Sequence, residues 1–462
     1  MENTTAPVKM PPGPKRNMLL SRRNTFSKGI LQFLQGFVKE YPGIGRIKTG
    51  TLSFVVLTNP DYVEHVFMNR DKYVKIQEGG NLRYLLGNGL LTSEGEFWMK
   101  QRKLIQPVFH KQRLQGFVQK ITDCTNDMLD AWEQRDENTT TDMLAEMNKL
   151  TLDIVGKTLL STDVKGDFKK VSDALTIVLE NITRRRQRIL QLPYWVPVPE
   201  HVRMQRYIKV LNDTVMDIIN QRRKDTNTYD DLLTMLMEVE DADTAERMSD
   251  IQLRDEALTI FIAGHETTAN AMSFIFYLLA KHPAVKQRME QELITGLGKE
   301  ELSYEKLMKL EYTQMVIKEA MRLYPPAWVV VRRAATDDVI DDYQIKEKDI
   351  VIVSPYAVQN SDVLWNRAEE FDPERFAPAN AKGIHRYAYF PFGGGARLCI
   401  GNNFAMMEMQ IILALISKRF NYTLPNDYVM ELNPLITLRP KKGVPVYLKS
   451  IAEHGIKLLL AK

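Results

Sequence analysis

Cysteine is scarce in this sequence, because only Cys124 and Cys399 occur among the 462 residues. Two cysteines can form at most one disulfide bond, so a disulfide scaffold and a four-thiolate metal site are excluded and a reducing compartment is favoured. The N-terminus (MENTTAPVKMPPGPKRNMLL) lacks the apolar core of a signal peptide, and charged and polar side chains interrupt the long apolar stretch at residues 261–280. We therefore expect a soluble, cytoplasmic protein.

A large excess of charge of one sign is also missing. The 62 lysines and arginines nearly balance the 58 aspartates and glutamates, and the net charge of +4 excludes the concentrated basicity of a nucleic-acid-binding protein. Apolar residues make up 44% and charged residues 26%, which is typical of a globular protein. No repeat of solenoid length and no Gly/Ser linker divides the chain.

The distribution of helix and strand signals indicates the fold class. Alternating and β-branched residues predict short strands within residues 44–60, 339–356 and 436–448, whereas helical periodicity dominates residues 97–320. Strands at both ends of a helical body predict a mainly α fold with small β-sheets (α+β). We expect one interleaved domain over residues 25–462, preceded by a flexible tail at residues 1–24.

A long helix is predicted from Ser249 to His282, where Pro283 stops it. One face of this helix carries mostly small residues and is nearly flat: Ile260, Ala263, Gly264, Thr267 and Ala271. The Thr267 hydroxyl can bond back to the Ala263 carbonyl and loosen the turn, which would leave a groove for a small molecule or water. The alternative is that Glu266 is a solvated acid and the threonines fill space. The zinc signature HExxH is excluded, because its last position is Ala269.

The stretch FPFGGGARLCIG (390–401) places Cys399 directly before a predicted helix, whose free amides favour an anion. The three glycines, 393 to 395, allow a tight turn and the close approach of a flat partner. Arg397 supplies a cation for an acidic group. A thiolate, an arginine and a flat helix face describe a haem pocket with cysteine as the axial ligand.

Glu319 and Arg322 are spaced i, i+3 at the end of a predicted helix that Pro325 and Pro326 stop. Such a pair is most often a surface ion pair of small energetic value. A more specific interpretation needs a third partner, and the FDPERF segment offers Arg375.

At this point the sequence resembles the cytochrome P-450 superfamily over about residues 30–450. The haem-binding signature is matched by Phe392, Gly395, Arg397, Cys399 and Gly401. The segment AGHETT at 263–268 is similar to the oxygen-binding helix of the family, and Glu319-x-x-Arg322 with PERF at 373–376 resembles its charge triad. A fifth match is Trp98-x-x-x-Arg102.

The resemblance implies haem b with Cys399 as axial ligand, because no covalent C-x-x-C-H attachment motif occurs. It assigns Trp98, Arg102 and Arg333 to the haem propionates, with Arg332 as a rival for Arg333. It implies a monooxygenase that inserts one atom of O2 into its substrate, with Thr267 and Glu266 assisting oxygen activation and proton delivery. The alternatives are a peroxide-driven peroxygenase and a non-catalytic haem-thiolate sensor.

The same resemblance implies a lipophilic substrate, such as a fatty acid, terpenoid or carotenoid, that is hydroxylated or epoxidised. The residues expected to line its pocket are Leu85, Leu86, Phe261, Ala263, Ala327, Val329, Leu435 and Ile436.

Electrons are expected from a separate ferredoxin or flavodoxin and its reductase. The basic residues at 100–113 would dock such a partner or would form a solvated face. We hypothesise that a lid at residues 183–199 contacts membrane lipid, with an exposed helix as the alternative. A monomer is expected.

Overall fold

The computed structural model describes residues 8–14, 29–76, 81–161, 174, 177–178, 181–182, 196–225, 227, 229–240, 245–298 and 301–451. The chain divides into two compact units, each built from segments that are distant in the sequence. The first unit comprises Met1–Glu78, Lys318–Cys399 and Thr437–Arg439, and the second comprises Gly79–Ile317, Ile400–Ile436 and Pro440–Lys462. The described chain is mostly helical with small sheets, which confirms the predicted fold class. That residues 25–462 act as one domain stays a prediction.

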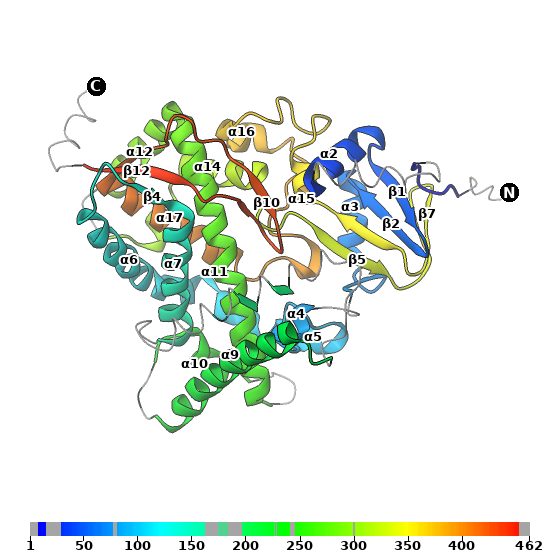
Figure 1. The fold of residues 1–462 in the computed structure, drawn as a ribbon, viewed down its shortest axis with the longest axis horizontal. Coiled ribbons are helices and arrows are strands. Elements are labelled where there is room, and N and C mark those ends of the chain that lie inside the picture. The colour runs from blue at the N-terminus through cyan, green and yellow to red at the C-terminus, as the bar shows by residue number, and fades with distance from the viewer. Residues whose placement is uncertain are drawn as a thin grey trace. The chain divides into compact units, whose positions relative to one another are not determined.

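A five-stranded sheet organises the first unit, with the strand order β1-β2-β8-β5-β3. Its strands β1 (Ile44–Thr49) and β2 (Leu52–Leu57) form an antiparallel hairpin, as the turn at Thr49-Gly50 predicts. Strand β8 (Ile350–Val353) pairs parallel to β2 and antiparallel to β5 (Val330–Ala334). In Figure 1 these strands are blue and yellow. The other elements wholly in this unit are α2 (Ile30–Glu40), α3 (Pro60–Met68), β3 (Tyr73–Val74), β6 (Asp338–Ile340), β7 (Tyr343–Ile345), α15 (Pro355–Gln359), η3 (Pro373–Phe376), α16 (Pro378–Ala381), η4 (Arg386–Ala388) and η5 (Gly395–Arg397).

Apolar side chains on one face of this sheet form the core of the first unit. Val55, Leu57, Val351 and Val353 are buried and pack against side chains of α3, including Phe67. β-branched residues fit a pleated surface of this kind, which explains why these segments become strands.

Residues 8–14 belong to the segment predicted to be a flexible tail, and they make specific contacts with other segments of the first unit. The Lys9 backbone exchanges hydrogen bonds with Asp342 and Gln344, and its side chain forms an ion pair with Asp342. The Arg46 N–H donates to the Pro12 carbonyl at 2.7 Å. The contacts of Lys9 span more than 300 residues of sequence, so no local pattern could have indicated them.

Helix α11 (Asp250–Lys281) is the central element of the second unit. The Ser249 side chain caps its first turn by accepting from the Gln252 N–H, and Pro283 begins the next helix, so the predicted bounds of 249–282 are confirmed. In Figure 1 it is the long green helix, and α7 (Met143–Val155) and α9 (Pro199–Lys224) pack against it. Helix α17 (Asn402–Arg419) packs against α6 (Lys111–Glu133).

The other helices of the second unit are α4 (Asn81–Leu86), α5 (Gly95–Ile105), η1 (Gln106–Phe109), η2 (Gly156–Leu160), α10 (Leu232–Glu238), α12 (Pro283–Leu297) and α13 (Tyr304–Leu307). A three-stranded sheet joins β4 (Thr140–Asp142), β12 (Pro445–Ser450) and β9 (Phe420–Thr423), and β10 (Leu432–Pro434) also lies here. Helix α14 (Glu311–Leu323) and strand β11 (Leu438–Pro440) contribute residues to both units. Among the helices in the described part of the chain, none is long and apolar enough to span a bilayer.

Candidate active site

The cysteine segment is a tight turn that only glycine can form at its centre. Gly395 has φ +59°, and a Cβ atom there would overlap the carbonyl oxygen of Phe67. A Cβ atom on Gly394 would overlap the Tyr387 ring. The turn closes through the Cys399 N–H, which donates to the Phe392 carbonyl at 2.9 Å. The result is a fixed loop that leaves Cys399 exposed.

The other cysteine has the opposite environment. Cys124 is buried on α6, and burial raises the pKa of its thiol to about 12. A thiol of this kind stays protonated and inert. Cys399 is exposed and precedes Gly401, the N-terminal capping residue of α17, so the predicted helix after the cysteine is confirmed. The residues therefore fit a group that needs one accessible thiolate.

Three charged side chains form the predicted triad within the first unit. Arg322 donates from Nε to Glu319 Oε2 and from Nη2 to Glu319 Oε1, both at 2.8 Å, and neither side chain has accessible surface. Arg375 Nε reaches Glu319 Oε1 at 3.2 Å. Burial raises the pKa of the Glu319 carboxyl, and the Arg322 guanidinium opposes that rise. The alternative of an exposed surface pair is therefore excluded.

The triad is connected to the cysteine segment by Gln359. Arg322 Nη1 donates to the Gln359 carbonyl at 2.7 Å, and the Gln359 side-chain oxygen accepts from the Phe390 N–H at 2.9 Å. Phe390 opens the FPFGGGARLCIG stretch. Gln359 is fully buried and also donates to the Met321 and Arg322 carbonyls, so it links the end of α14 to this loop. Sequence reasoning missed it, because a lone glutamine carries no motif.

The middle of α11 has an open face in an otherwise buried helix. Ala263 is exposed and Gly264, Glu266 and Thr267 are half-buried, whereas Ala269 and Ala271 are buried. The Thr267 hydroxyl donates to the Ala263 carbonyl at 2.6 Å, as predicted from the spacing. An exposed alanine at the centre of a 32-residue buried helix indicates space for a flat group beside it.

His265 holds this segment of α11 to α7. Its Nε2 lies 3.1 Å from the Asn148 carbonyl, and the Thr151 hydroxyl donates to the His265 carbonyl at 3.1 Å. Burial lowers the pKa of His265 to about 4, so the ring is neutral and Nε2 carries the proton. No sequence signal other than the rejected zinc motif singles out His265.

The residues expected at the haem propionates lie in both units. Trp98 and Arg102 are one helical turn apart on α5, with Trp98 buried and Arg102 half-buried. Arg332 and Arg333 are neighbours on β5, so their side chains point to opposite faces of the sheet and only one can serve. Arg332 Nη1 donates to the Val331 carbonyl at 3.0 Å.

Part of the expected substrate pocket is closed. Leu85, Leu86 and Phe261 have almost no accessible surface, because α4 packs against α11. Phe261 borders a cavity of only about 10 Å³ with residues of η2 and α9, too small for a substrate. Leu85 and Leu86 are thus buried among core residues, and their place in a substrate pocket stays a prediction. The expected residues that retain accessible surface are Ala263, Ala327, Val329, Leu435 and Ile436.

The surface features predicted for partners are only partly described. Lys100 pairs with Glu246 at 2.8 Å, and Lys111 lies over the Tyr304 ring, so these two basic residues also have partners within the chain. Arg184 to Arg186, Tyr194 and Trp195, which carry the lid hypothesis, lie outside the described residues.

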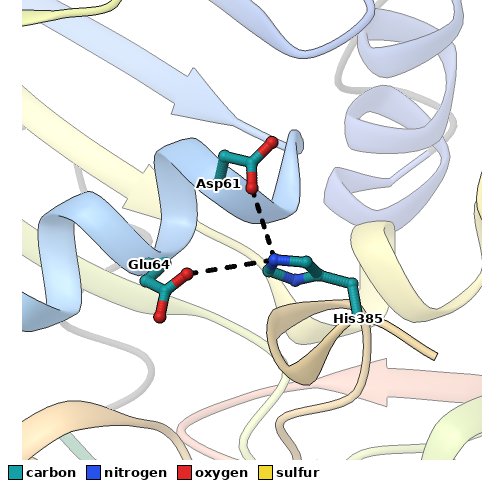
Figure 2. A group of neighbouring side chains, drawn as sticks. All are labelled: Asp61, Glu64 and His385. Atoms are coloured by element: carbon teal, nitrogen blue, oxygen red, sulfur yellow. Dashed lines mark ion pairs between the residues drawn. The ribbon is translucent and has the colours of Figure 1, made fainter. Parts of the chain in front are cut away.

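Asp61, Glu64 and His385 form a second group of potential ligands, drawn in Figure 2. His385 Nε2 lies 3.3 Å from Asp61 Oδ1 and 3.9 Å from Glu64 Oε2. His385 Nδ1 accepts from the Tyr387 N–H at 3.1 Å as the cap of η4, so the proton of the neutral ring is on Nε2. A metal would need Nε2 free and Nδ1 protonated. The geometry therefore describes a contact between the His385 ring and the two carboxylates of α3, which needs no metal.

Comparison with known proteins identifies the family. The sequence model described as cytochrome P450 matches residues 11–445. Cyclooctat-9-en-7-ol 5-monooxygenase of Streptomyces melanosporofaciens is 30% identical over 417 residues, which cover 90% of this chain and 88% of the relative. Chloroplastic carotene epsilon-monooxygenase of Arabidopsis thaliana is 28% identical over 435 residues, which cover 89% and 80%. The crystal structure of the cytochrome P450DA heme domain has a TM-score of 0.87 at 24% identity and covers 97% of this chain and 100% of that one.

The match to the family extends over nearly the whole chain, and the solved structure independently supports the fold. Members of this family carry a haem whose iron is ligated by a cysteine thiolate. The chain belongs to the cytochrome P450 family and is a haem-thiolate monooxygenase.

Proposed function

We propose that Cys399 is the axial ligand of the haem iron. The observation that carries this proposal is the contrast between the two cysteines: Cys399 is exposed on a glycine loop, and Cys124 is a buried thiol whose pKa is raised to about 12. A thiolate is required for ligation, and the loop before α17 favours one through the helix amides. Phe392, Gly395, Arg397 and Gly401 shape the loop around this ligand.

When bound, a cysteine-ligated haem binds O2 and favours cleavage of its O–O bond. The α11 residues then have separable roles. The Thr267 proton is committed to the Ala263 carbonyl at 2.6 Å, so the hydroxyl oxygen offers its lone pairs to the open face as a hydrogen-bond acceptor. Glu266 is half-buried beside it and can pass protons from solvent to that face. Both residues therefore control protons and neither touches the substrate carbon.

Trp98, Arg102 and either Arg332 or Arg333 are proposed to hold the propionates, since guanidinium and indole N–H groups donate to carboxylates. The triad of Glu319, Arg322 and Arg375 is proposed to be structural. It reaches the cysteine segment through backbone and Gln359 contacts, and its own charges satisfy one another.

The proposed substrate is a lipophilic molecule of the terpenoid, carotenoid or fatty acid class, hydroxylated or epoxidised at one carbon. The names of two relatives, a cyclooctat-9-en-7-ol monooxygenase and a carotene monooxygenase, support an apolar substrate. The expected pocket residues that retain accessible surface are all apolar. We propose a monomer in the cytoplasm that receives electrons from a separate ferredoxin or flavodoxin. The proposed docking cations are Lys100, Arg102, Lys103, Lys111 and Arg113.

The alternatives from the sequence are a peroxide-driven peroxygenase and a non-catalytic sensor, and the relatives named as monooxygenases weigh against both. The presence of Glu266 next to Thr267 on the open face favours a monooxygenase that uses O2 and needs protons. A peroxide-driven enzyme or a sensor needs no proton delivery from the protein. Thr267→Ala should leave haem binding intact and lower the yield of product per electron consumed. An unchanged yield would favour one of the alternatives.

The deciding experiment is the carbon monoxide difference spectrum of the dithionite-reduced protein. We expect the strongly red-shifted Soret band of thiolate ligation in the wild type and in Cys124→Ser, and its loss in Cys399→Ser. A band at the ordinary wavelength that Cys399→Ser leaves unchanged would mean that another residue ligates the iron. Cys124→Ser is the matched control, because it removes the other thiol and leaves the glycine loop intact.

A further inference from the structure

Two adjacent acids on the N-terminal half of α11 accept backbone hydrogen bonds from a turn between α4 and α5. The Asn88 N–H donates to Asp255 Oδ2 at 2.7 Å, and the Leu90 N–H donates to Glu256 Oε2 at 2.9 Å. Both carboxylates are buried, and Glu256 has no accessible surface. We call residues 87–90, with the sequence GNGL, the 87–90 turn.

The 87–90 turn is shaped to fit this part of α11. Gly87 has φ +53°, and a Cβ atom there would overlap the Asp255 carboxylate. A Cβ atom on Gly89 would overlap the Thr259 hydroxyl and would lie 2.7 Å from the Asp255 carbonyl oxygen. The Thr92 hydroxyl closes the turn from the other side by donating to the Gly87 carbonyl at 2.9 Å. The two glycines thus allow the turn to lie directly on the helix.

Packing alone does not explain why acids occupy these positions. Asp255 also pairs with Arg254, but in the described chain Glu256 Oε1 and the Thr259 hydroxyl have no hydrogen-bond partner. Burial raises the pKa of Glu256 to about 7, and the Leu90 N–H opposes that rise. Buried carboxyl groups are costly unless they are paired, so a neutral or apolar residue would be more stable here if only packing mattered.

The 87–90 turn precedes α5 in the chain and contacts α11, and the proposed function gives both helices a role. It leads into α5, which begins at Gly95 and carries Trp98 and Arg102. On the other side, Glu256 precedes Ala263 by seven residues of continuous helix, about 10 Å at the usual rise. A contact that fixes the turn on α11 therefore fixes the start of α5 relative to the open face of α11.

We propose that Asp255 and Glu256 are positioning residues that latch the 87–90 turn to α11. They thereby fix the position of α5, the proposed propionate-binding helix, relative to Glu266 and Thr267 on α11. The role of α5 rests on the proposed function, whereas the latch itself rests on the two observed hydrogen bonds. The latch acts through the backbone N–H groups of Asn88 and Leu90 and not through their side chains.

The test uses the haem-loaded ferric protein and hydrogen–deuterium exchange measured on peptides covering residues 87–93 and 95–105. At pH 8, where the Glu256 carboxyl is mostly ionised, Glu256→Gln and Asp255→Asn each replace a charged acceptor by a weaker neutral one of the same shape. Gly89→Ala opens the latch independently, because its Cβ atom forces the turn away from α11 without changing either acid. We expect exchange about tenfold faster or more in both peptides for all three variants, because a bond to a charged acceptor is worth at least about 1.4 kcal/mol.

Two control variants match these changes. Glu292→Gln weakens a similar clasp, because Glu292 accepts the Tyr312 and Thr313 N–H groups at 2.7 Å, and Gly36→Ala adds a Cβ atom that meets nothing within 4 Å. Both should leave exchange at residues 87–105 unchanged. Faster exchange confined to residues 87–93, or no change in either peptide, would overturn the latch.

A second readout follows haem transfer to apomyoglobin, which should be faster in the three latch variants than in the controls. The carbon monoxide difference spectrum of the same samples separates this inference from the proposed function. If Cys399 is not the ligand, that spectrum changes while the exchange experiment still decides the latch. If the thiolate band is present and α5 exchanges as in the wild type, the latch fails and the proposed function stands.

Discussion

Glu408 on α17 is a buried acid with almost no compensation. Its carboxyl has no accessible surface, and burial raises its pKa from 4.5 to about 8. The Thr268 hydroxyl on α11 faces it and offsets part of that rise, but neither carboxyl oxygen makes a hydrogen bond of good geometry within the described chain. We therefore expect the Glu408 carboxyl to be protonated at neutral pH. Its ionisation should lower the free energy of unfolding of the protein.

The size of the effect follows from the two pKa values. The gap between about 8 and 4.5 is about 3.5, and one pKa unit corresponds to about 1.36 kcal/mol, so ionisation of Glu408 costs the folded state about 5 kcal/mol. Because the pKa of Glu408 is raised in the folded state, the stability that depends on its neutral form is fully present below pH 4.5. That stability is lost as the pH rises through about 8. Between pH 5 and pH 9 the loss is about 4 kcal/mol.

Glu408→Gln keeps the shape of the side chain and removes the proton that can be lost. For a chain of this length 1 kcal/mol shifts the unfolding midpoint by about 1 °C, so the variant should gain about 4 °C on the wild type between pH 5 and pH 9. Thermal unfolding of the haem-loaded proteins at one scan rate measures this difference. The effects of the other titrating groups cancel, because they are the same in the wild type and in the variant. An infrared carbonyl band of a protonated carboxyl should be present in the wild type and absent in the variant. Parallel pH profiles of the two proteins would refute the buried neutral acid.

Two further predictions concern the loop that carries Cys399. Glu319→Gln removes the charge shared by Arg322 and Arg375, and leaving a buried guanidinium without its carboxylate should cost about 3 to 5 kcal/mol, measured as a lower ratio of haem to purified protein. Retained haem content would contradict that role. Gly395→Ala should abolish haem binding because its Cβ atom overlaps the Phe67 carbonyl at a positive φ, and a normal Soret band in this variant would show that the loop is not fixed.

The elements with local signals were predictable from the sequence. The bounds of α11 follow from the Ser249 cap and from Pro283, and the hairpin of β1 and β2 follows from Thr49-Gly50 between β-branched runs. The bond from Thr267 to Ala263 was also predictable, because a mid-helix threonine reaches the carbonyl four residues earlier. In each case the determining atoms lie within a few residues of one another.

The rest depends on packing between distant segments. Leu85 and Leu86 read equally well as pocket or core residues, and the packing of α4 against α11 makes them core. His265 has a role only because Asn148, 117 residues earlier, presents a carbonyl to its ring. Gln359 belongs to no sequence motif, and it contacts the Cys399 loop only because the fold brings the Phe390 N–H to its side chain. A single sequence states which residues are present, and it does not state which carbonyl or amide each will meet.

The buried acids show how the fold decides what one residue type does. Glu319 meets two guanidinium groups, Glu256 meets one backbone N–H, and Glu408 meets one hydroxyl. All three have raised pKa values from the same cause, loss of water, so the partners decide how much of that loss is recovered. On that argument Glu408 should deprotonate last, with Glu256 before it near pH 7. Glu408, whose single partner is a hydroxyl and whose pKa is raised to about 8, is thus the acid whose ionisation destabilises this fold in alkali, although it belongs to no motif in the sequence.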